Sequence, residues 1–261
     1  MNALAYDRVG SGPPLVLLHP LGADRRVWRP VLARLSAQRD CIAVDLPGFG
    51  ESPALAGPAH PGDLARVVGA LASELGIPPG GAHLAGNSLG GWVAFESALG
   101  GDAASVTAIA PAGLWTRPLA PKPELARSVA RAARPLLPLV LRVPAARRAI
   151  LSGTVARPDQ VPSDAALALV RTYADAPGFT AANRAMRSAT FARLDEIEVP
   201  VTLVWPEFDR IVARPRSLPP NVTSLGLPGC GHVPMWDDPE AVAAALLAGS
   251  SSAAPDEAAV A

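Results

Sequence analysis

The segment Gly86-Asn87-Ser88-Leu89-Gly90 constrains the fold more than any other part of this chain. It follows a short apolar run, 82–85, and precedes apolar residues at helical spacing over 92–99. A strand that turns at once into a helix leaves little room beside the turn, and the glycines at 86 and 90 meet that requirement. The pattern therefore predicts a strand, a sharp turn and a helix, with the Ser88 hydroxyl exposed at the turn.

A serine hydroxyl attacks well at neutral pH only where a base accepts its proton, and His232 is the best candidate among four histidines. It ends the glycine-rich turn Gly229-Cys230-Gly231-His232, after the apolar stretch 222–227 and before a helix expected to begin near Asp238. His83 is expected to pack or hydrogen-bond within the buried strand, and His60 lies in a surface segment rich in proline and glycine.

A carboxylate is needed to orient such a histidine, and Asp209 is the candidate. The apolar strand 105–110 is followed by Pro-Ala-Gly-Leu without an acid, whereas the strand 201–205 is followed by Pro206-Glu207-Phe208-Asp209-Arg210. Glu207 is the neighbouring alternative. Asp237 and Asp238 are too close to His232 in sequence to reach back easily and are expected to begin the last helix.

The chain resembles the α/β-hydrolase superfamily at this serine motif, in the order Ser88, Asp209, His232, and in the loop His19-Pro20-Leu21-Gly22. The resemblance implies an oxyanion hole built from the backbone N–H groups of Leu21 and Leu89. The loop departs from the superfamily pattern at Pro20, which has no N–H but is not the implied donor. His19 is expected to orient the loop by hydrogen bonds.

The resemblance continues through Asp45-Leu46-Pro47-Gly48-Phe49-Gly50-Glu51-Ser52 and spans residues 15 to 240, leaving the middle unmatched. In the superfamily this acidic segment is structural, so Asp45 is not assigned a catalytic role. The serine motif is similar to that of carbon–carbon bond hydrolases, and His-Pro-Leu-Gly resembles enol-lactonases and bacterial carboxylesterases.

Alternating strands and helices predict an α/β fold: a mostly parallel sheet flanked by helices. A chain of 261 residues that is 49% hydrophobic can form one such domain. The core is expected over 1–113 and 191–248. Residues 114–190 contain helical stretches broken by prolines and no convincing strand, which predicts an inserted helical cap; 249–261 lack periodicity and predict a disordered tail.

The cap is expected to contribute the substrate pocket, through Trp115, Leu136, Phe179 and Met186, although such residues often only attach a cap to its core. Residues 114–190 carry 12 Lys or Arg against 4 Asp or Glu, in a chain of zero formal net charge. This excess could attract an anionic substrate or a carrier protein, but solvated helix faces are the simpler interpretation.

Several classes are disfavoured by composition. Zero net charge and the absence of a basic stripe with aromatics argue against nucleic acid as a partner. No apolar stretch approaches a membrane span or a signal peptide, so a cytoplasmic protein is expected. Two cysteines, Cys41 and Cys230, form no metal or redox spacing, and no metal or organic cofactor is expected.

These residues predict a serine hydrolase that cleaves a carboxylic ester or a related activated acyl bond of a small molecule through an acyl-enzyme. The same residues would also serve a carbon–carbon bond (diketone) hydrolase or an enol-lactonase. A non-catalytic ligand-binding protein of this fold is the alternative from another class. Hydrolases with a carboxylate nucleophile are disfavoured, because residue 88 is serine.

Overall fold

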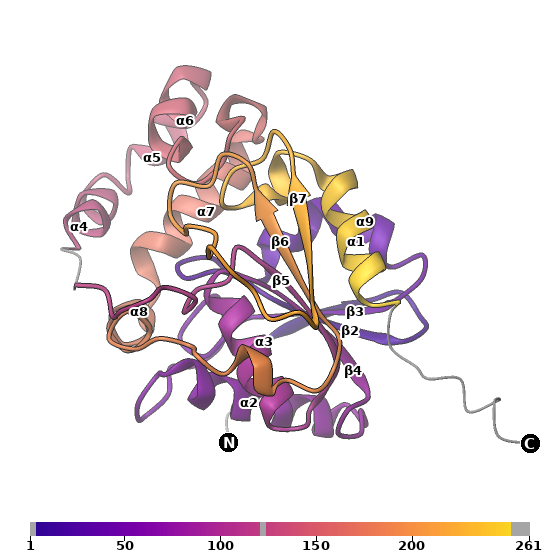
Figure 1. The fold of residues 1–261 in the computed structure, drawn as a ribbon. Coiled ribbons are helices and arrows are strands. Elements are labelled where there is room, and N and C mark those ends of the chain that lie inside the picture. The colour runs from indigo at the N-terminus through magenta and orange to yellow at the C-terminus, as the bar shows by residue number, and fades with distance from the viewer. Residues whose placement is uncertain (1–3, 121–123, 252–261) are drawn as a thin grey trace, which may run out of the picture.

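A computed structural model describes residues 4–120 and 124–251, which form a seven-stranded sheet with helices on both faces (Figure 1). The strands lie in the order β1-β3-β2-β4-β5-β6-β7, and only β1 is antiparallel to its neighbour. Their bounds are β1 Tyr6–Val9, β2 Pro14–Leu18, β3 Asp40–Val44, β4 Ala82–Asn87, β5 Ala103–Ile109, β6 Val201–Pro206 and β7 Val222–Leu227. The predicted α/β fold with a mostly parallel sheet is confirmed.

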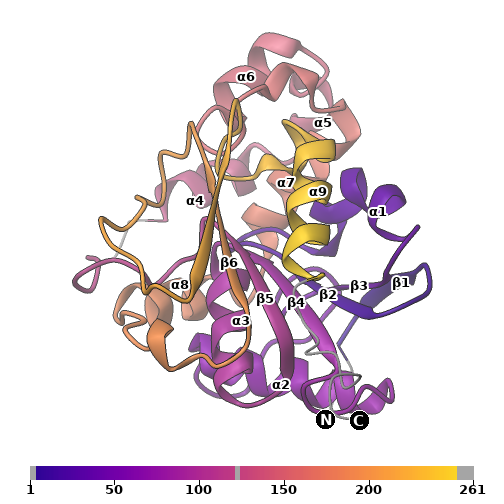
Figure 2. The same ribbon diagram turned by 45° about the vertical axis from the view of Figure 1, so that its right-hand side comes forward.

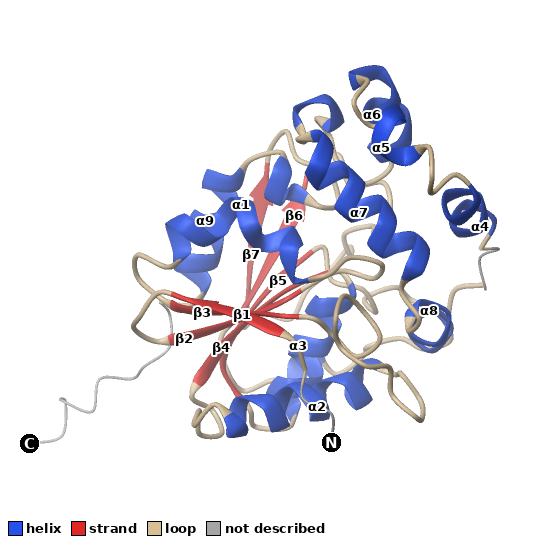
Figure 3. Ribbon diagram, turned by 180° about the vertical axis from the view of Figure 1, so that it is seen from behind, coloured by secondary structure: helices blue, strands red, loops and turns tan. Residues whose placement is uncertain are grey.

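Four helices cover the sheet. Helices α1 (Arg29–Leu35) and α9 (Pro239–Gly249) pack together on one face, and α2 (Pro61–Glu74) and α3 (Leu89–Leu99) on the other, as the rear view shows (Figure 3). The central strands β2 to β5 are buried almost throughout, as strands covered on both faces are.

Among the described residues between β5 and β6, within the segment predicted as a cap, there are five helices. They are α4 (Leu125–Ala132), α5 (Leu137–Val140), α6 (Pro144–Leu151), α7 (Ser163–Asp175) and α8 (Phe179–Arg187). The arrowheads of β6 and β7 point towards α5 and α6 (Figures 1 and 2). Because the carboxyl ends of parallel strands carry the functional loops, the inserted helices lie over the end of the sheet where a site is expected.

The first strand has no counterpart in the sequence analysis. Residues Tyr6–Val9 are mostly exposed, so they lack the apolar run by which the other strands were identified. The strand is held by pairing with β3 and by an ion pair between Arg8 and Asp40, with Nη2 and Oδ2 2.6 Å apart. Tertiary pairing therefore decides its conformation.

The predicted tail begins too early. Helix α9 runs to Gly249, and the Arg39 guanidinium donates from Nε to Ser250 Oγ at 3.1 Å and from Nη2 to Ser251 Oγ at 3.2 Å. Residues 249–251 are thus attached to the core, by a partner distant in sequence. The remainder of the predicted tail, 252–261, lies outside the described residues. Within the described part of the chain, no helix combines the length and apolarity needed to cross a bilayer.

Candidate active site

Ser88 lies at the turn between β4 and α3, as the sequence predicts, but it is not exposed to bulk solvent: it is only 6% exposed and borders an internal cavity. Its φ of 55° and ψ of −112° fall outside the regions that non-glycine residues ordinarily occupy. The turn is held by backbone hydrogen bonds from Ser88 N to Ile109 O (2.9 Å) and from Ala112 N to Ser88 O (2.9 Å). The neighbouring strand thereby imposes the strained conformation and fixes the direction of the hydroxyl.

The glycines of the turn are required by close backbone contacts. A Cβ on Gly90 would lie 2.1 Å from the carbonyl oxygen of Leu18, and one on Gly86 would lie 2.2 Å from the carbonyl carbon of Gly90. Both atoms belong to the backbone and cannot move aside as a side chain would. The close approach of α3 to β2 and β4 therefore depends on the absence of side chains at these two positions.

His232 and Asp209 form a buried pair. Nδ1 of His232 lies 2.7 Å from Oδ2 of Asp209, and each side chain is only 5% exposed. The other carboxylate oxygen accepts from the backbone N–H groups of Ile211 (2.7 Å) and Val212 (3.1 Å). An ionised carboxylate only accepts, so Nδ1 carries the proton in neutral His232 and Nε2 is left as an acceptor.

Asp209 is stabilised in its charged form. Burial favours the neutral acid, but the hydrogen bond and charge of His232 and the two backbone donors outweigh it and hold the pKa of Asp209 below its ordinary value. The alternative acid, Glu207, is exposed and accepts from the backbone N–H of Gly229 at 2.8 Å. The structure thus pairs His232 with Asp209 and uses Glu207 to hold the loop that precedes the histidine.

Asn87 connects the serine turn to the histidine loop. Its Nδ2 donates to the carbonyl oxygens of Ile109 and His232, each at 3.0 Å. Asn87 is fully buried, and its Oδ1 has no hydrogen-bond partner. The two donors of the amide are therefore the part of this side chain that the site uses, a role the sequence motif alone does not indicate.

The loop after β2 is held by His19. Its Nε2 accepts from the backbone N–H of Leu46 at 2.9 Å, so Nδ1 is the donor to the carbonyl oxygen of Pro20 at 2.8 Å. Burial lowers the pKa of His19, which favours this neutral tautomer. His19 orients the loop, as the resemblance implies. Leu21 of this loop lines the same cavity as Ser88, and Leu89 opens α3, where N–H groups have no partner within the helix.

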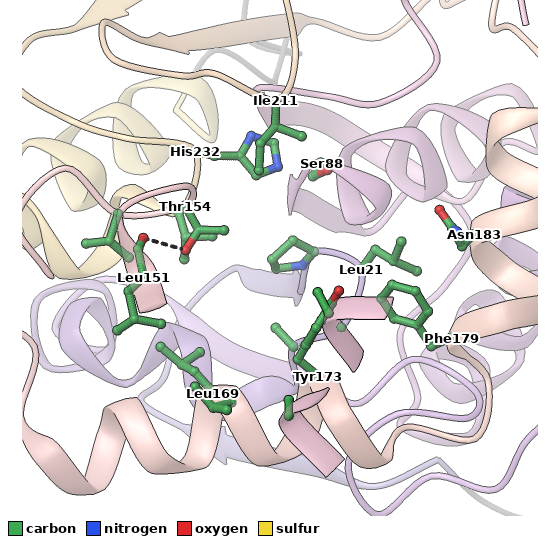
Figure 4. Close-up of a pocket in the computed structure, with 18 of the residues that line it drawn as sticks. Leu21, Ser88, Leu151, Thr154, Leu169, Tyr173, Phe179, Asn183, Ile211 and His232 are labelled. Atoms are coloured by element: carbon green, nitrogen blue, oxygen red, sulfur yellow. Dashed lines mark hydrogen bonds between the residues drawn. The ribbon is translucent and has the colours of Figure 1, made fainter. Parts of the chain in front are cut away.

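A cavity of about 560 Å³ joins these groups to the cap. Ser88 and His232 lie at one wall, and Leu169 and Tyr173 of α7 lie opposite, with Phe179 and Asn183 to the side (Figure 4). The dashed line marks the bond from Thr154 Oγ1 to Leu151 O, 3.1 Å long. The lining is mainly apolar, with Glu124 and Arg187 adding opposite charges.

Two of the four predicted pocket residues line the cavity and two do not. Phe179 and Met186 do, whereas Trp115 and Leu136 lie elsewhere. Trp115 donates from Nε1 to the carbonyl oxygen of Ala189 at 2.8 Å and packs edge-on against Trp92, so it attaches the cap to α3. Leu136 is 62% exposed, and the neighbouring Leu137, only 4% exposed, is buried in its place.

The sequence analysis missed Leu169, Val170 and Tyr173, which bring α7 to the cavity. Their spacing of one and four residues is a helical signal that could have identified them. Tyr173 packs edge-on against Phe179, with ring centroids 5.3 Å apart, and the Arg127 guanidinium lies 4.3 Å above the Phe179 ring. This contact holds Phe179 between α4 and α7.

Asp237 differs from its expected role. Only Asp238 caps the last helix, by accepting from Ala241 N at 2.9 Å. Asp237 instead accepts from the backbone N–H groups of Ala156 (3.0 Å), Arg157 (2.7 Å) and Gly231 (2.8 Å). It therefore joins the segment after α6 to the loop that carries His232. A residue that contacts a distant part of the chain gives no local sequence signal.

The remaining candidate groups have structural partners. His83 Nδ1 lies 2.9 Å from Ser105 Oγ, and the carboxylate of Asp45 accepts from the backbone N–H of Arg25 at 2.7 Å and of Glu51 at 2.8 Å. Both cysteines are buried and unpaired, and burial together with Asp237 and Asp238 raises the pKa of Cys230 to about 12. Across residues 4–120 and 124–251, no cluster of three or more metal-binding side chains occurs.

Comparisons with known proteins agree with this fold. A family model described as "Alpha/beta hydrolase family" matches residues 15–245. The chain is 37% identical to epoxide hydrolase EphH of Mycobacterium tuberculosis over 60% of its own length and 80% of that protein. It is also 40% identical to the pimeloyl-[acyl-carrier protein] methyl ester esterase of Aeromonas hydrophila, over 37% of this chain and 36% of the esterase.

Two solved structures illustrate the likeness in fold. A membrane phospholipase A is 30% identical, with a TM-score of 0.74, and the match covers 96% of this chain and 84% of the phospholipase. The enol-lactonase of Burkholderia xenovorans LB400 has a TM-score of 0.75 at 22% identity, over 95% of this chain and 96% of that enzyme. The second likeness concerns the fold alone.

Proposed function

The chain belongs to the α/β-hydrolase family, and on that premise we propose that it is a serine hydrolase that cleaves a carboxylic ester through an acyl-enzyme. The observation that carries the proposal is the 2.7 Å contact between His232 and Asp209, beside a cavity that His232 shares with Ser88. A neutral histidine oriented in this way presents Nε2 as a base for a serine hydroxyl.

The reaction begins with attack of Ser88 Oγ on the ester carbonyl carbon while Nε2 of His232 accepts the hydroxyl proton. The N–H groups of Leu21 and Leu89 stabilise the oxyanion of the tetrahedral intermediate, and each lowers the activation barrier by on the order of 3 kcal/mol. The intermediate collapses, the carbon–oxygen bond of the leaving group breaks, and His232 returns the proton to the departing alcohol. Asp209 stabilises the imidazolium in between.

Deacylation repeats these steps with water. His232 accepts a proton from water, the hydroxide attacks the acyl carbon, and the second tetrahedral intermediate releases the carboxylic acid while the proton returns to Ser88 Oγ. The products are an acid and an alcohol. The sequence of steps uses only groups of this chain and one water molecule.

The cavity supports an apolar acyl or alkyl group as the substrate part held by the cap. Its volume of about 560 Å³ falls within the usual range for small-molecule sites, and Leu151, Leu169 and Met186 are among its lining residues. Glu124 and Arg187 give the lining mixed charge, so the cavity itself does not favour an anionic substrate.

Epoxide opening is a second candidate, because the chain is 37% identical to epoxide hydrolase EphH. Attack of Ser88 on an epoxide carbon would leave an ether, which the same base and oxyanion donors cannot hydrolyse as they hydrolyse an ester. The serine at position 88 therefore favours acyl chemistry. Cleavage of a diketone or an enol-lactone uses the same acyl chemistry and is distinguished by substrate.

The test is intact-mass spectrometry after exposure to a small fluorophosphonate, with Ser88→Ala and His232→Ala beside the unmodified chain. Ser105→Ala and His83→Ala serve as matched controls, because this pair is also buried and hydrogen-bonded but lies away from the cavity. We expect one adduct, absent in Ser88→Ala and greatly slowed in His232→Ala only. No adduct on the unmodified chain, or one that survives Ser88→Ala, would overturn the proposal.

The bond is then identified with p-nitrophenyl esters, an enol-lactone, a vinylogous 1,5-diketone and a styrene-type epoxide. Turnover of the esters at the highest kcat/KM is the expected result. Turnover of the epoxide alone, with no adduct on Ser88, would overturn the ester proposal in favour of epoxide hydrolysis. Labelling without turnover of any of these compounds would favour a ligand-binding role.

A further inference from the structure

The cap contains a long basic segment without acids. Residues 125–158 include seven arginines and no Asp or Glu, in a chain whose formal net charge is zero. This segment comprises helices α4, α5 and α6 and the turn that follows. The positive excess of the cap is therefore concentrated in one continuous stretch of chain.

The three helices form the outer layer of the cap. They lie farther from the sheet than α7, which runs between them and the core (Figures 2 and 3). Six large apolar side chains of this layer are between 43% and 72% exposed, namely Leu125, Val129, Leu136, Leu139, Val143 and Ile150. We call these residues, with the exposed arginines between them, the outer cap face. So many exposed aliphatic side chains on one short segment are typical of an interaction surface.

Four arginines of the outer cap face are exposed, Arg131, Arg134, Arg142 and Arg148. Arg134 lies 3.4 Å from Asp175 and Arg148 lies 3.3 Å from Asp159, which are long contacts of exposed guanidinium groups and leave most of their donors accessible. By contrast, Arg127 and Arg147 are buried and donate to backbone carbonyl oxygens of the cap. Arg131 also holds the cap, because its Nη2 donates to Ala174 O of α7 at 2.8 Å. The other three exposed arginines, Arg134, Arg142 and Arg148, make no hydrogen bond of this kind to the backbone of the described residues.

Aliphatic side chains interspersed with arginines and free of acids are complementary to an anionic lipid surface. The aliphatic groups can enter the boundary between headgroups and acyl chains, while guanidinium groups contact the phosphates. An acidic protein would complement the arginines, but it would not by itself account for aliphatic residues on all three helices. The observations therefore favour lipid over protein as the occupant.

The outer cap face is continuous with the cavity. Ala126 and Ala130 of α4 and Ile150 and Leu151 of α6 line the cavity that contains Ser88. Ile150 belongs to both surfaces. An acyl chain leaving a bilayer at this face would therefore pass from lipid to the cavity along apolar side chains.

We propose that the outer cap face docks on an anionic lipid surface and that the ester cleaved at Ser88 is drawn from that surface. The docking is independent of catalysis, whereas the source of the ester rests on the proposed function. The substrate class is then a lipid-soluble ester whose acyl chain partitions into membranes.

The test is flotation of the full chain with vesicles of phosphatidylcholine alone and with about 30 mol% phosphatidylglycerol. We expect the protein to float with the anionic vesicles only, and to be released in about 0.5 M NaCl, where screening shortens the range of the charges to a few ångström. Arg134→Gln, Arg142→Gln and Arg148→Gln combined should weaken binding roughly 100-fold, at about fivefold per arginine. Leu136→Ser with Leu139→Ser should also abolish flotation.

Matched controls keep the test specific. Arg29→Gln, Arg34→Gln and Arg66→Gln combined remove the same charge from exposed positions on α1 and α2, and should bind vesicles like the unmodified chain. Val9→Ser removes an exposed aliphatic residue from β1 with the same expectation. All variants should keep the melting temperature and the rate of fluorophosphonate labelling, which shows that the fold and Ser88 are intact.

Three outcomes would overturn the docking proposal: no flotation with either vesicle, equal loss of binding in the control triple variant, or a stable complex with an acidic carrier protein or a second copy in place of vesicle binding. Flotation with no preference for a lipid-soluble ester in vesicles over a short soluble ester would overturn the proposed source of the substrate. Failure of fluorophosphonate labelling, in contrast, concerns the proposed function and leaves the flotation result standing.

Discussion

The side-chain amide of Asn87 donates a 3.0 Å hydrogen bond to the carbonyl oxygen of His232, so the residue before the candidate nucleophile holds the backbone of the candidate base. The same amide donates to Ile109 at the end of β5. Two loops that are 145 residues apart in sequence are thereby joined beside the cavity. This side chain therefore helps to fix the relative position of Ser88 and His232, together with the bonds that Asp209 and Asp237 make to the histidine loop.

Replacing Asn87 should therefore impair labelling and turnover as well as stability. In Asn87→Ala two buried carbonyl oxygens lose a donor, which costs about 1–3 kcal/mol in the free energy of unfolding. Displacement of His232 should lower kcat/KM for an ester roughly 10- to 100-fold. Asn87→Asp should be worse, because it places a carboxylate against the two carbonyl oxygens. Ser105→Ala is the control, and an equal loss of kcat/KM there would contradict this role.

Removing the Asp209 carboxylate should affect catalysis more than the fold. Asp209→Asn no longer fixes the tautomer of His232, and kcat should fall by roughly 10⁴-fold, as in other enzymes that use this arrangement. Glu207→Gln is the comparison, since Glu207 only holds the backbone of Gly229, and it should lower kcat by less than about tenfold. Similar losses in the two variants would contradict the pairing of His232 with Asp209.

The pKa of Asp209 also predicts a dependence of stability on pH. Its pKa in the folded chain lies below its ordinary value of 3.8, so the folded state binds fewer protons than the unfolded state as pH falls through this range. The stabilisation from Asp209 is complete above that ordinary value and is lost as pH falls towards the folded-state pKa. Urea unfolding of the native chain and Asp209→Asn should show a difference that is constant from pH 6 to 5 and shrinks below about pH 4.

A methyl group at position 90 should disrupt the serine turn. Because the added Cβ would lie 2.1 Å from Leu18 O, Gly90→Ala must separate α3 from β2. We expect a loss of about 3 kcal/mol or more in the free energy of unfolding and no fluorophosphonate adduct. Gly153→Ala is the matched control, since nothing lies within 4 Å of its added Cβ, and should change stability by less than about 0.5 kcal/mol. A stable, labelled Gly90→Ala would contradict the close contact.

Asp237 and Asp238 allow two roles to be tested separately: Asp237 holds the segment after α6, and Asp238 accepts a hydrogen bond at the N-terminus of α9. Asp237→Ala leaves three backbone N–H groups without their acceptor and should release the segment around Ala156. Asp238→Ala removes one hydrogen bond at the N-terminus of α9, worth about 1 kcal/mol in the free energy of unfolding. Limited proteolysis should cut near residue 156 faster in Asp237→Ala only. Equal cleavage in both variants would show that Asp237 acts simply through overall stability.

Much of the core could be predicted from local patterns. The strand before Ser88 and the helix after it were evident from an apolar run and from helical spacing. The edge strand Tyr6–Val9 could not be predicted, because its residues are mostly exposed and pairing with β3 decides its conformation. The start of the tail was predicted too early, at residue 249, because Ser250 is held by Arg39, 211 residues away in sequence.

The sequence by itself determined the chemical groups of this protein and their order: a serine at a glycine-flanked turn, an aspartate after a strand and a histidine in a glycine-rich loop. Each is defined by its immediate neighbours, so each can be read locally. Only the tertiary structure decided which cap side chains reach the cavity. Phe179 lines it, whereas Leu136 is exposed. The sequence did not separate the two, because short helices in a proline-rich segment carry too little periodicity to show which face is buried.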